Sequence, residues 1–104
     1  VHGFYKGEAN LDFETMQEIN NNLPIPLVLH GGTGIPEEKI RKAISSGISK
    51  ININTELQSV WSKAVRKYLK ENETVYDPRK IISSGESAIK EKIAEIVTLF
   101  GTKI

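Results

Sequence analysis

The stretch PIPLVLHGGTGIP, residues 24–36, constrains the fold more than any other part of the sequence. Its apolar centre, Leu27 to Leu29, does not alternate with polar residues, which is typical of a strand buried on both faces, as in a parallel sheet. The prolines before it cannot continue a helix, and the glycine-rich turn after it leads into a helical pattern. The stretch therefore predicts a strand, a loop and a helix, with the strand in a parallel sheet.

Helical patterns flank this predicted strand on both sides. The first covers residues 11–23, and Asp12 is suited to its N-cap. The second covers residues 35–47, where Pro36 lies at a position that needs no N–H group and Gly47 suits the carboxy-terminal cap.

A second strand is predicted at residues 49–56, SKININTE. Isoleucine and asparagine alternate in it, so Ile51 and Ile53 face one side while Asn52 and Asn54 face the other.

The last part of the chain is predicted to be helical. Thr55 is the expected cap of a helix at residues 56–70, whose apolar positions follow the i, i+3, i+4, i+7 rule. Asp77 and Pro78 predict a short helical turn, and a final helix is expected at residues 84–100. Its expected core face comprises Ile89, Ile93, Ile96, Val97 and Phe100.

The alternation of strands and helices with short loops predicts a parallel α/β architecture. A complete (β/α)8 barrel needs roughly 250 residues, so this chain of 104 residues would hold about three of the eight units plus a terminal helix. An open doubly wound sheet is the alternative on pattern alone. Because the first residue is Val and not Met, we expect the chain to be part of a longer polypeptide.

The composition argues against several classes of protein. The 14 basic and 13 acidic residues are interspersed and give a formal net charge of +1, so no nucleic-acid-binding surface is expected. No apolar run approaches the ~20 residues that cross a bilayer, and no signal peptide is visible. There is no cysteine, which excludes disulfides and thiolate metal sites. A cytoplasmic protein without a membrane or nucleic-acid partner is expected.

Three loops that directly follow predicted strand ends, called corners below, carry unusual polar residues. They are His2-Gly3, residues 30–34 and residues 52–55. In parallel α/β folds this is the face where ligands bind. Neighbouring strands lie ~4.8 Å apart, so His2 and His30 are candidates to share one metal ion. A catalytic zinc site usually has three protein ligands; a histidine that only hydrogen-bonds to a neighbour is the alternative for each ring.

The glycine-rich corner also predicts an anion site. Residues 31–33 lead into a helix, and exposed N–H groups at a helix start hold phosphate or carboxylate. A turn that simply needs the conformational freedom of glycine is the alternative. Thr55 starts the next helix and offers a second donor, while Lys6 and Arg79 are loop residues that can supply a charge to phosphate.

Asn52 and Asn54 indicate a binding site more specifically than the glycines do. Asparagine disfavours strands, and a buried amide needs partners for all its polar atoms. They are predicted to hold substrate hydroxyls or a carbonyl; a polar network that fills the end of the barrel is the alternative.

Four parts of the sequence together resemble a known family: HGFYKGE with LDFE, PLVLHGGTGIP, KININTE and YDPRK. Their order and spacing are similar to those of the class II, metal-dependent fructose-bisphosphate aldolases, from the first residue to the last helix. The resemblance implies a (β/α)8 barrel of which residues 1–104 form the carboxy-terminal segment, in a homodimer or homotetramer. It also implies reversible aldol cleavage of a phosphorylated sugar, a ketose 1,6-bisphosphate, to dihydroxyacetone phosphate and an aldehyde phosphate.

By similarity, His2 and His30 correspond to two of the zinc ligands. A monovalent cation, Na⁺ or K⁺, is also implied beside the phosphate. Arg79 resembles an arginine that reaches the other substrate phosphate, in some members from a neighbouring subunit. The positions implied for substrate binding are Gly3, Lys6, Gly31, Gly32, Thr33, Asn52, Ile53, Asn54, Thr55 and Arg79.

The family's third zinc-binding histidine and its catalytic aspartate lie upstream of the first residue here. The 104-residue chain alone is therefore expected to be inactive. Fructose 1,6-bisphosphate is the leading substrate, because tagatose-type members tend to read HGASG and NVATE where this chain has HGGTG and NINTE. Tagatose-bisphosphate aldolase, the deoxy-phosphogluconate aldolase of inositol breakdown, and an inactive fragment that only binds phosphate or assembles are the alternatives.

Overall fold

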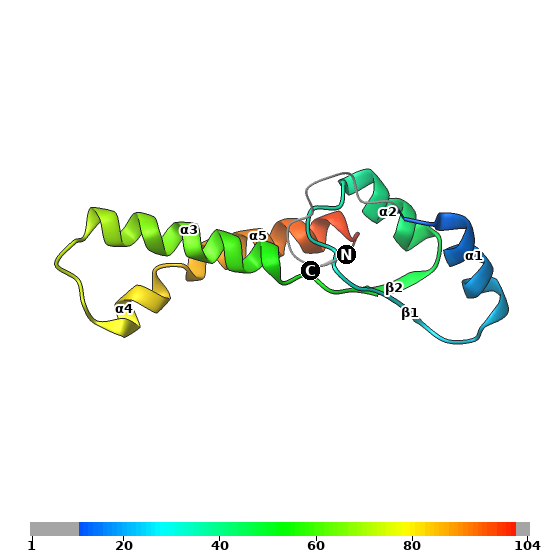
Figure 1. The fold of residues 1–104 in the computed structure, drawn as a ribbon, viewed down its shortest axis with the longest axis horizontal. Helices are drawn as coiled ribbons and strands as arrows, with labels where there is room; N and C mark the ends of the chain where they lie inside the picture. The colour runs from blue at the N-terminus through cyan, green and yellow to red at the C-terminus, as the bar shows by residue number, and fades with distance from the viewer. Residues whose placement is uncertain (1–10, 102–104) are drawn as a thin grey trace.

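The structure is a computed structural model that describes residues 11–101. Figure 1 shows α1, α2 and both strands at one end of an elongated molecule, with α3, α4 and α5 extending from them as a helical arm. The molecule measures 59 × 32 × 20 Å. The elements in chain order are α1 (Phe13–Asn22), β1 (Leu27–Leu29), α2 (Glu37–Ser45), β2 (Ile48–Ile51), α3 (Thr55–Glu71), α4 (Pro78–Ser83) and α5 (Glu86–Leu99).

The two strands pair in parallel, and α2 connects them. Leu29 lies opposite Ile51 at the carboxyl ends of the strands, so both strands end at the same edge. This βαβ connection confirms the predicted α/β class and the parallel arrangement.

Two details of the predicted strands are wrong. Val28 is 42% exposed, because within residues 11–101 only one other strand and one layer of helices pack around β1. The second strand begins at Ile48 and ends at Ile51 instead of covering residues 49–56. Residues 52–54 leave the strand and lead into α3.

Local capping signals place most helix ends correctly. Asp12 caps α1 by accepting a hydrogen bond from the Thr15 N–H at 3.0 Å, which lowers the pKa of Asp12. Asp77 caps α4, and Pro78 is its first residue. Gly47 follows α2 with a φ of +113°, a conformation that favours glycine.

Other predicted helix details are wrong. Thr55 is the first residue of α3, and Asn54 holds the N-cap position without a side-chain hydrogen bond. Helix α5 begins at Glu86, two residues later than predicted. Ile93, placed on the core face of α5 by its spacing, is 44% exposed because the described elements cover only part of that face.

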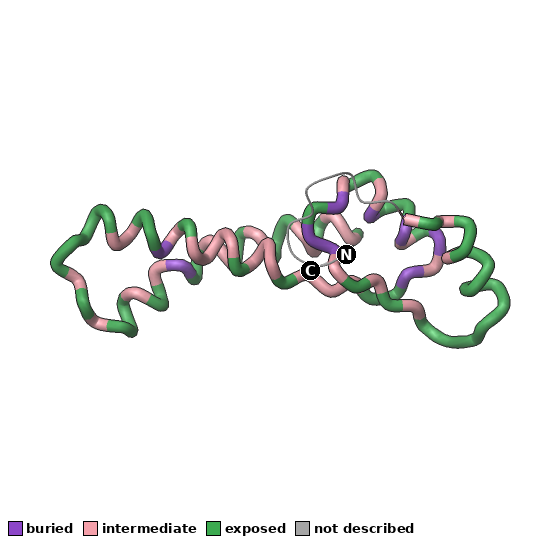
Figure 2. The backbone as a smooth tube through the Cα atoms, in the orientation of Figure 1, coloured by how far each residue is buried: buried purple, intermediate pink, exposed green. Residues whose placement is uncertain are grey.

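The hydrophobic core is small and lies between α2, the sheet and the end of α5. Ile35 and Ile40 form its centre and are only 8% and 2% exposed. Figure 2 shows most of the buried positions at this end of the molecule and largely exposed backbone at the tip of the arm. The partly buried residues packed against the centre are Leu11, Leu29, Ile44, Ile51, Leu99 and Phe100. The same core that supports the strand ends therefore also holds the arm.

The arm depends on a close contact between α3 and the turn before α5. The Trp61 indole Nε1 donates a hydrogen bond to the Ile82 carbonyl at 3.2 Å, and Gly85 is buried against the indole ring. A Cβ on Gly85 would overlap the Trp61 ring. Among the described residues, no helix is both long and apolar enough to cross a membrane.

The packing of Gly85 predicts that Gly85→Ala destabilises the protein by about 1–3 kcal/mol, because the added methyl group displaces the Trp61 ring. Gly85 has an ordinary φ of −94°, so the cost comes from packing and not from the backbone. Urea unfolding of the protein measures it. The double variant Gly85→Ala/Trp61→Leu should lose less stability than the sum of the two single changes, whereas strict additivity would contradict the steric explanation.

Candidate functional site

The described site residues gather where β1 and β2 end, and glycine is needed at this corner for two different reasons. Gly31 and Gly34 have φ values of +68° and +79°, which side-chain-bearing residues rarely adopt. At Gly32 the constraint is space, since a Cβ there would lie 2.7 Å from Ile51 Cγ2 and 3.2 Å from the Asn52 carbonyl oxygen. The glycine-rich loop therefore lies directly against the chain that follows β2.

Backbone hydrogen bonds join the two corners. The Asn52 N–H donates to the Leu29 carbonyl at 3.0 Å, and the Gly32 N–H donates to the Asn52 carbonyl at 2.9 Å. The pairing of the two strands thus continues past their ends, and it fixes the loop after β1 against the segment after β2.

Thr33 makes a third connection, from the loop to helix α3. Its side-chain oxygen accepts a hydrogen bond from the Glu56 N–H at 3.3 Å, and the residue is only 4% exposed. The first N–H groups of a helix have no partner within the helix, so Thr33 supplies one from a loop 23 residues away in the chain. The glycine-rich loop and the start of α3 are held as one unit.

His30 lies beside the Asn52 side chain. The Asn52 Nδ2 is 3.1 Å from the His30 Nδ1. When the amide presents its nitrogen, Nδ1 accepts the hydrogen bond with its lone pair, and Nε2 of the neutral ring carries the proton. When the amide presents its oxygen, the Nδ1–H donates to it and Nε2 is unprotonated. Because a metal binds an unprotonated nitrogen with a free lone pair, the second orientation of the Asn52 amide is the one that leaves Nε2 available to a metal. With the Asn52 amide oxygen toward the ring, His30 fits a metal ligand oriented by a second residue.

A pocket of about 490 Å³ lies at these corners. The start of α3 contributes to its wall, and the positive end of a helix favours an anion there. The lining residues are Gly31, Thr33, Ile51, Asn52, Ile53, Asn54 and Thr55. The structure therefore brings together six of the predicted substrate-binding positions in one cavity, while Gly32 lines the cavity next to it.

Arg79 does not join this group. It lies in α4 at the far end of the arm, away from the strand ends (Figure 1), and its side chain is 91% exposed. Its Nη2 lies 2.9 Å from Asp77 Oδ2, and this ion pair raises the pKa of Arg79 and lowers that of Asp77.

The remaining predicted site residues, His2, Gly3 and Lys6, lie outside the described residues. Within residues 11–101, no group of three or more histidine, aspartate or glutamate side chains could hold a metal ion. His30 is thus the predicted zinc ligand whose surroundings the structure describes.

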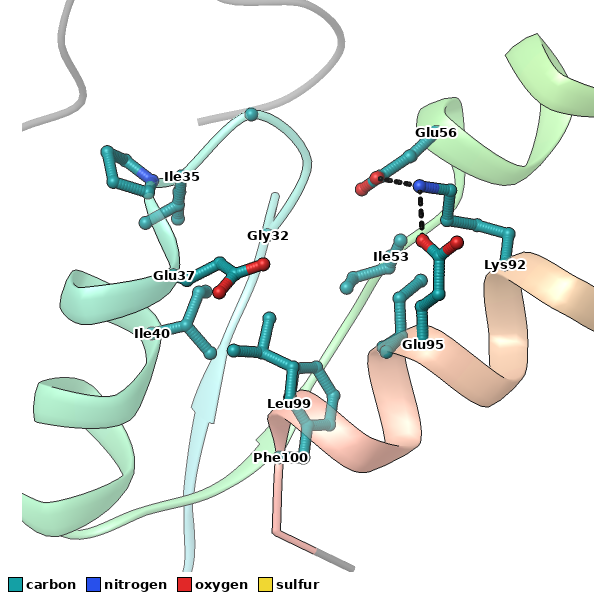
Figure 3. A pocket seen from close by; sticks show the side chains of 13 residues that line it. Gly32, Ile35, Glu37, Ile40, Ile53, Glu56, Lys92, Glu95, Leu99 and Phe100 are labelled. Carbon is teal, nitrogen blue, oxygen red and sulfur yellow. Dashed lines mark hydrogen bonds and ion pairs between the residues drawn. The ribbon is translucent and has the colours of Figure 1, made fainter.

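An ion-pair cluster next to this corner was missed by the sequence reasoning. Lys92 of α5 places its Nζ 3.3 Å from Glu56 Oε1 and 2.9 Å from Glu95 Oε2 (Figure 3). Glu95 and then Glu56 raise the pKa of Lys92. The spacing of Lys92 and Glu95 is an ordinary helical pair, but no local pattern connects either residue with Glu56, 36 residues earlier.

Comparison with known proteins identifies the family. The family model described as fructose-bisphosphate aldolase class-II matches residues 1–103. The chain is 55% identical over 102 residues to a fructose-bisphosphate aldolase of Geobacillus stearothermophilus and 52% identical to one of Staphylococcus epidermidis. Each alignment covers 98% of this chain and 36% of the relative, so the chain spans about a third of the length of these relatives.

Solved structures agree with this result. The YdjI aldolase of Escherichia coli K12 is 38% identical and superposes with a TM-score of 0.76 over 98% of this chain and 37% of its own. A fructose-bisphosphate aldolase of Campylobacter jejuni is 25% identical, with the same TM-score over 88% of this chain and 35% of its own. The expected fold, the carboxy-terminal portion of an α/β barrel, is confirmed. The chain belongs to the class II fructose-bisphosphate aldolase family.

Proposed function

We propose that residues 1–104 are the carboxy-terminal segment of a single barrel domain, and that the complete polypeptide cleaves a ketose 1,6-bisphosphate reversibly. Fructose 1,6-bisphosphate is the first candidate substrate, and the products are dihydroxyacetone phosphate and an aldehyde phosphate. The observation that carries this proposal is the hydrogen-bonded junction of the two corners, which puts His30 and Thr33 on either side of one glycine-rich loop.

The pocket at this junction suits one phosphate end of such a substrate. Thr33 and Thr55 offer hydroxyl groups, and the start of α3 offers a positive helix end. Gly31 and Gly32 let the backbone approach an anion without side chains in the way. Phosphate binding here would hold the substrate in a fixed orientation relative to His30, so that binding energy contributes to rate.

The proposed metal is Zn²⁺, held by His30 and His2 together with a ligand from the rest of the polypeptide. When bound, it would supply Lewis-acid stabilisation of the negative charge that develops on the ketone oxygen. Asn52 would orient the His30 ring, and Asn54 is proposed to contact substrate hydroxyls. A monovalent cation is proposed beside the phosphate.

The position of Arg79 bears on assembly. Its guanidinium group lies at the end of an arm that projects from the core, away from the pocket of its own chain. This geometry supports the proposal that the complete protein is a homodimer or homotetramer in which Arg79 serves the phosphate site of a neighbouring subunit. A cytoplasmic location accords with an aldolase that acts on sugar phosphates.

His30→Ala in the complete polypeptide should abolish zinc-dependent cleavage of fructose 1,6-bisphosphate, because the metal loses a ligand. Cleavage is measured by coupled assay and bound zinc by atomic absorption. Arg41→Ala, a change at an exposed position of α2, is the matched control and should retain both. Full activity of His30→Ala would refute the site. A parent protein that cleaves no ketose bisphosphate, tagatose and deoxy-phosphogluconate substrates included, would refute the function.

Thr33→Val should raise the KM for the bisphosphate about fivefold or more. This isosteric change removes the acceptor of the Glu56 N–H and a hydroxyl of the pocket, and one such hydrogen bond is worth about 1 kcal/mol. Thr33→Ser keeps the hydroxyl and should retain most of the affinity. Steady-state kinetics distinguish the two variants, and equal KM values for both would contradict the role of the hydroxyl.

A further inference from the structure

Glu56, in the first turn of α3, makes contacts with two different parts of the chain. Its backbone N–H donates to the Thr33 hydroxyl in the loop, while its carboxylate pairs with Lys92 of α5. A single residue thus connects the proposed phosphate pocket with the terminal helix.

The environment of Lys92 differs from that of an ordinary surface lysine. Its side chain is 24% exposed, and two carboxylates from different helices hold its ammonium group. Lys90, two residues earlier on α5, is 74% exposed and pairs with Glu86 within the same helix at 3.3 Å. Lysine is rarely buried without a specific partner, so the arrangement around Lys92 indicates a defined position.

Lys92 does not line the 490 Å³ pocket that holds Thr33 and Thr55. It lines the neighbouring cavity of about 310 Å³, where Glu37, Glu56 and Glu95 are the other charged groups (Figure 3). Any effect of Lys92 on a ligand in the first pocket therefore passes through Glu56.

Glu56 itself lines the 310 Å³ cavity, while Thr55, the residue before it in α3, lines the 490 Å³ pocket. A carboxylate in the first turn of α3 stabilises the helix, but it repels a phosphate that approaches the same helix end. The Glu56 carboxylate pairs with Lys92 of α5, which offsets its negative charge, while the Glu56 N–H donates to Thr33.

We propose that Lys92 is a positioning residue for the phosphate site: by pairing with Glu56 it neutralises the first turn of α3 and holds the junction with Thr33 in place. This inference rests on the proposed function, since it takes the pocket to be the phosphate site. It concerns a residue that does not line the pocket itself.

The test compares Lys92→Met, Lys92→Arg and the control Lys90→Met in the complete polypeptide. Inorganic phosphate is the probe, with its Kd from isothermal titration, and KM and kcat for fructose 1,6-bisphosphate are measured in parallel. Lys92→Met should raise the phosphate Kd and the KM about two- to fivefold, in proportion to the strength of a partly exposed ion pair, with a smaller change in kcat. Lys92→Arg should restore both values, and Lys90→Met should match the parent.

The double variant Glu56→Gln/Lys92→Met separates neutralisation from simple loss of stability. Gln keeps the backbone N–H but removes the negative charge, so the double variant should bind phosphate more tightly than Lys92→Met alone, although it lacks the same ion pair. It also provides the test if Lys92→Met alone fails to fold. Equal phosphate affinity of Lys92→Met and the parent, or no recovery in the double variant, would overturn the inference.

The two readouts distinguish the inference from the function on which it rests. A parent protein that binds phosphate but cleaves no ketose bisphosphate refutes the proposed reaction. The effect of Lys92 on the phosphate Kd can still be measured in that case. A parent protein that binds no phosphate refutes the role of Lys92.

Discussion

The hydrogen-bonded junction between the ends of β1 and β2 is the constraint on which the rest of the site depends. Asn52 bonds through its N–H to Leu29 and through its carbonyl to the Gly32 N–H, so it extends the parallel pairing beyond the last strand residues. The same residue places its amide against His30. One backbone pairing therefore fixes the loop, the candidate metal ligand and the wall of the pocket together.

A small core is enough to hold this junction because α2 and the end of α5 both pack into it. Ile35 lies directly after the glycine-rich loop and Ile40 lies in α2, and Leu99 and Phe100 bring the end of α5 against them. The elongated arm contributes to the site through this terminal helix and through Lys92. Val28 within β1 and Ile25 just before it are exposed apolar residues, and in the proposed complete barrel further strands and helices would cover them.

Much of the local structure followed from patterns a few residues long. The N-caps at Asp12 and Asp77 and the glycine after α2 were predicted because capping is decided by neighbouring residues. The clustering of residues 31–33 with residues 52–55 was also predictable, because the ends of parallel strands meet at one edge. The end of β2 at Ile51 was not, because the alternation of Ile and Asn continues to Asn54, beyond the last residue of the strand.

The sequence by itself determined the order of strands and helices, the glycine corners and the candidate metal and phosphate residues, since each rests on residue types at short spacing. The contacts that connect these parts were decided only by the tertiary structure. Thr33 meets the Glu56 N–H, and Lys92 meets the Glu56 carboxylate, across 23 and 36 residues of chain. Such pairs have no local signature, because they depend on how α3 and α5 pack over the sheet and not on the residues that flank them.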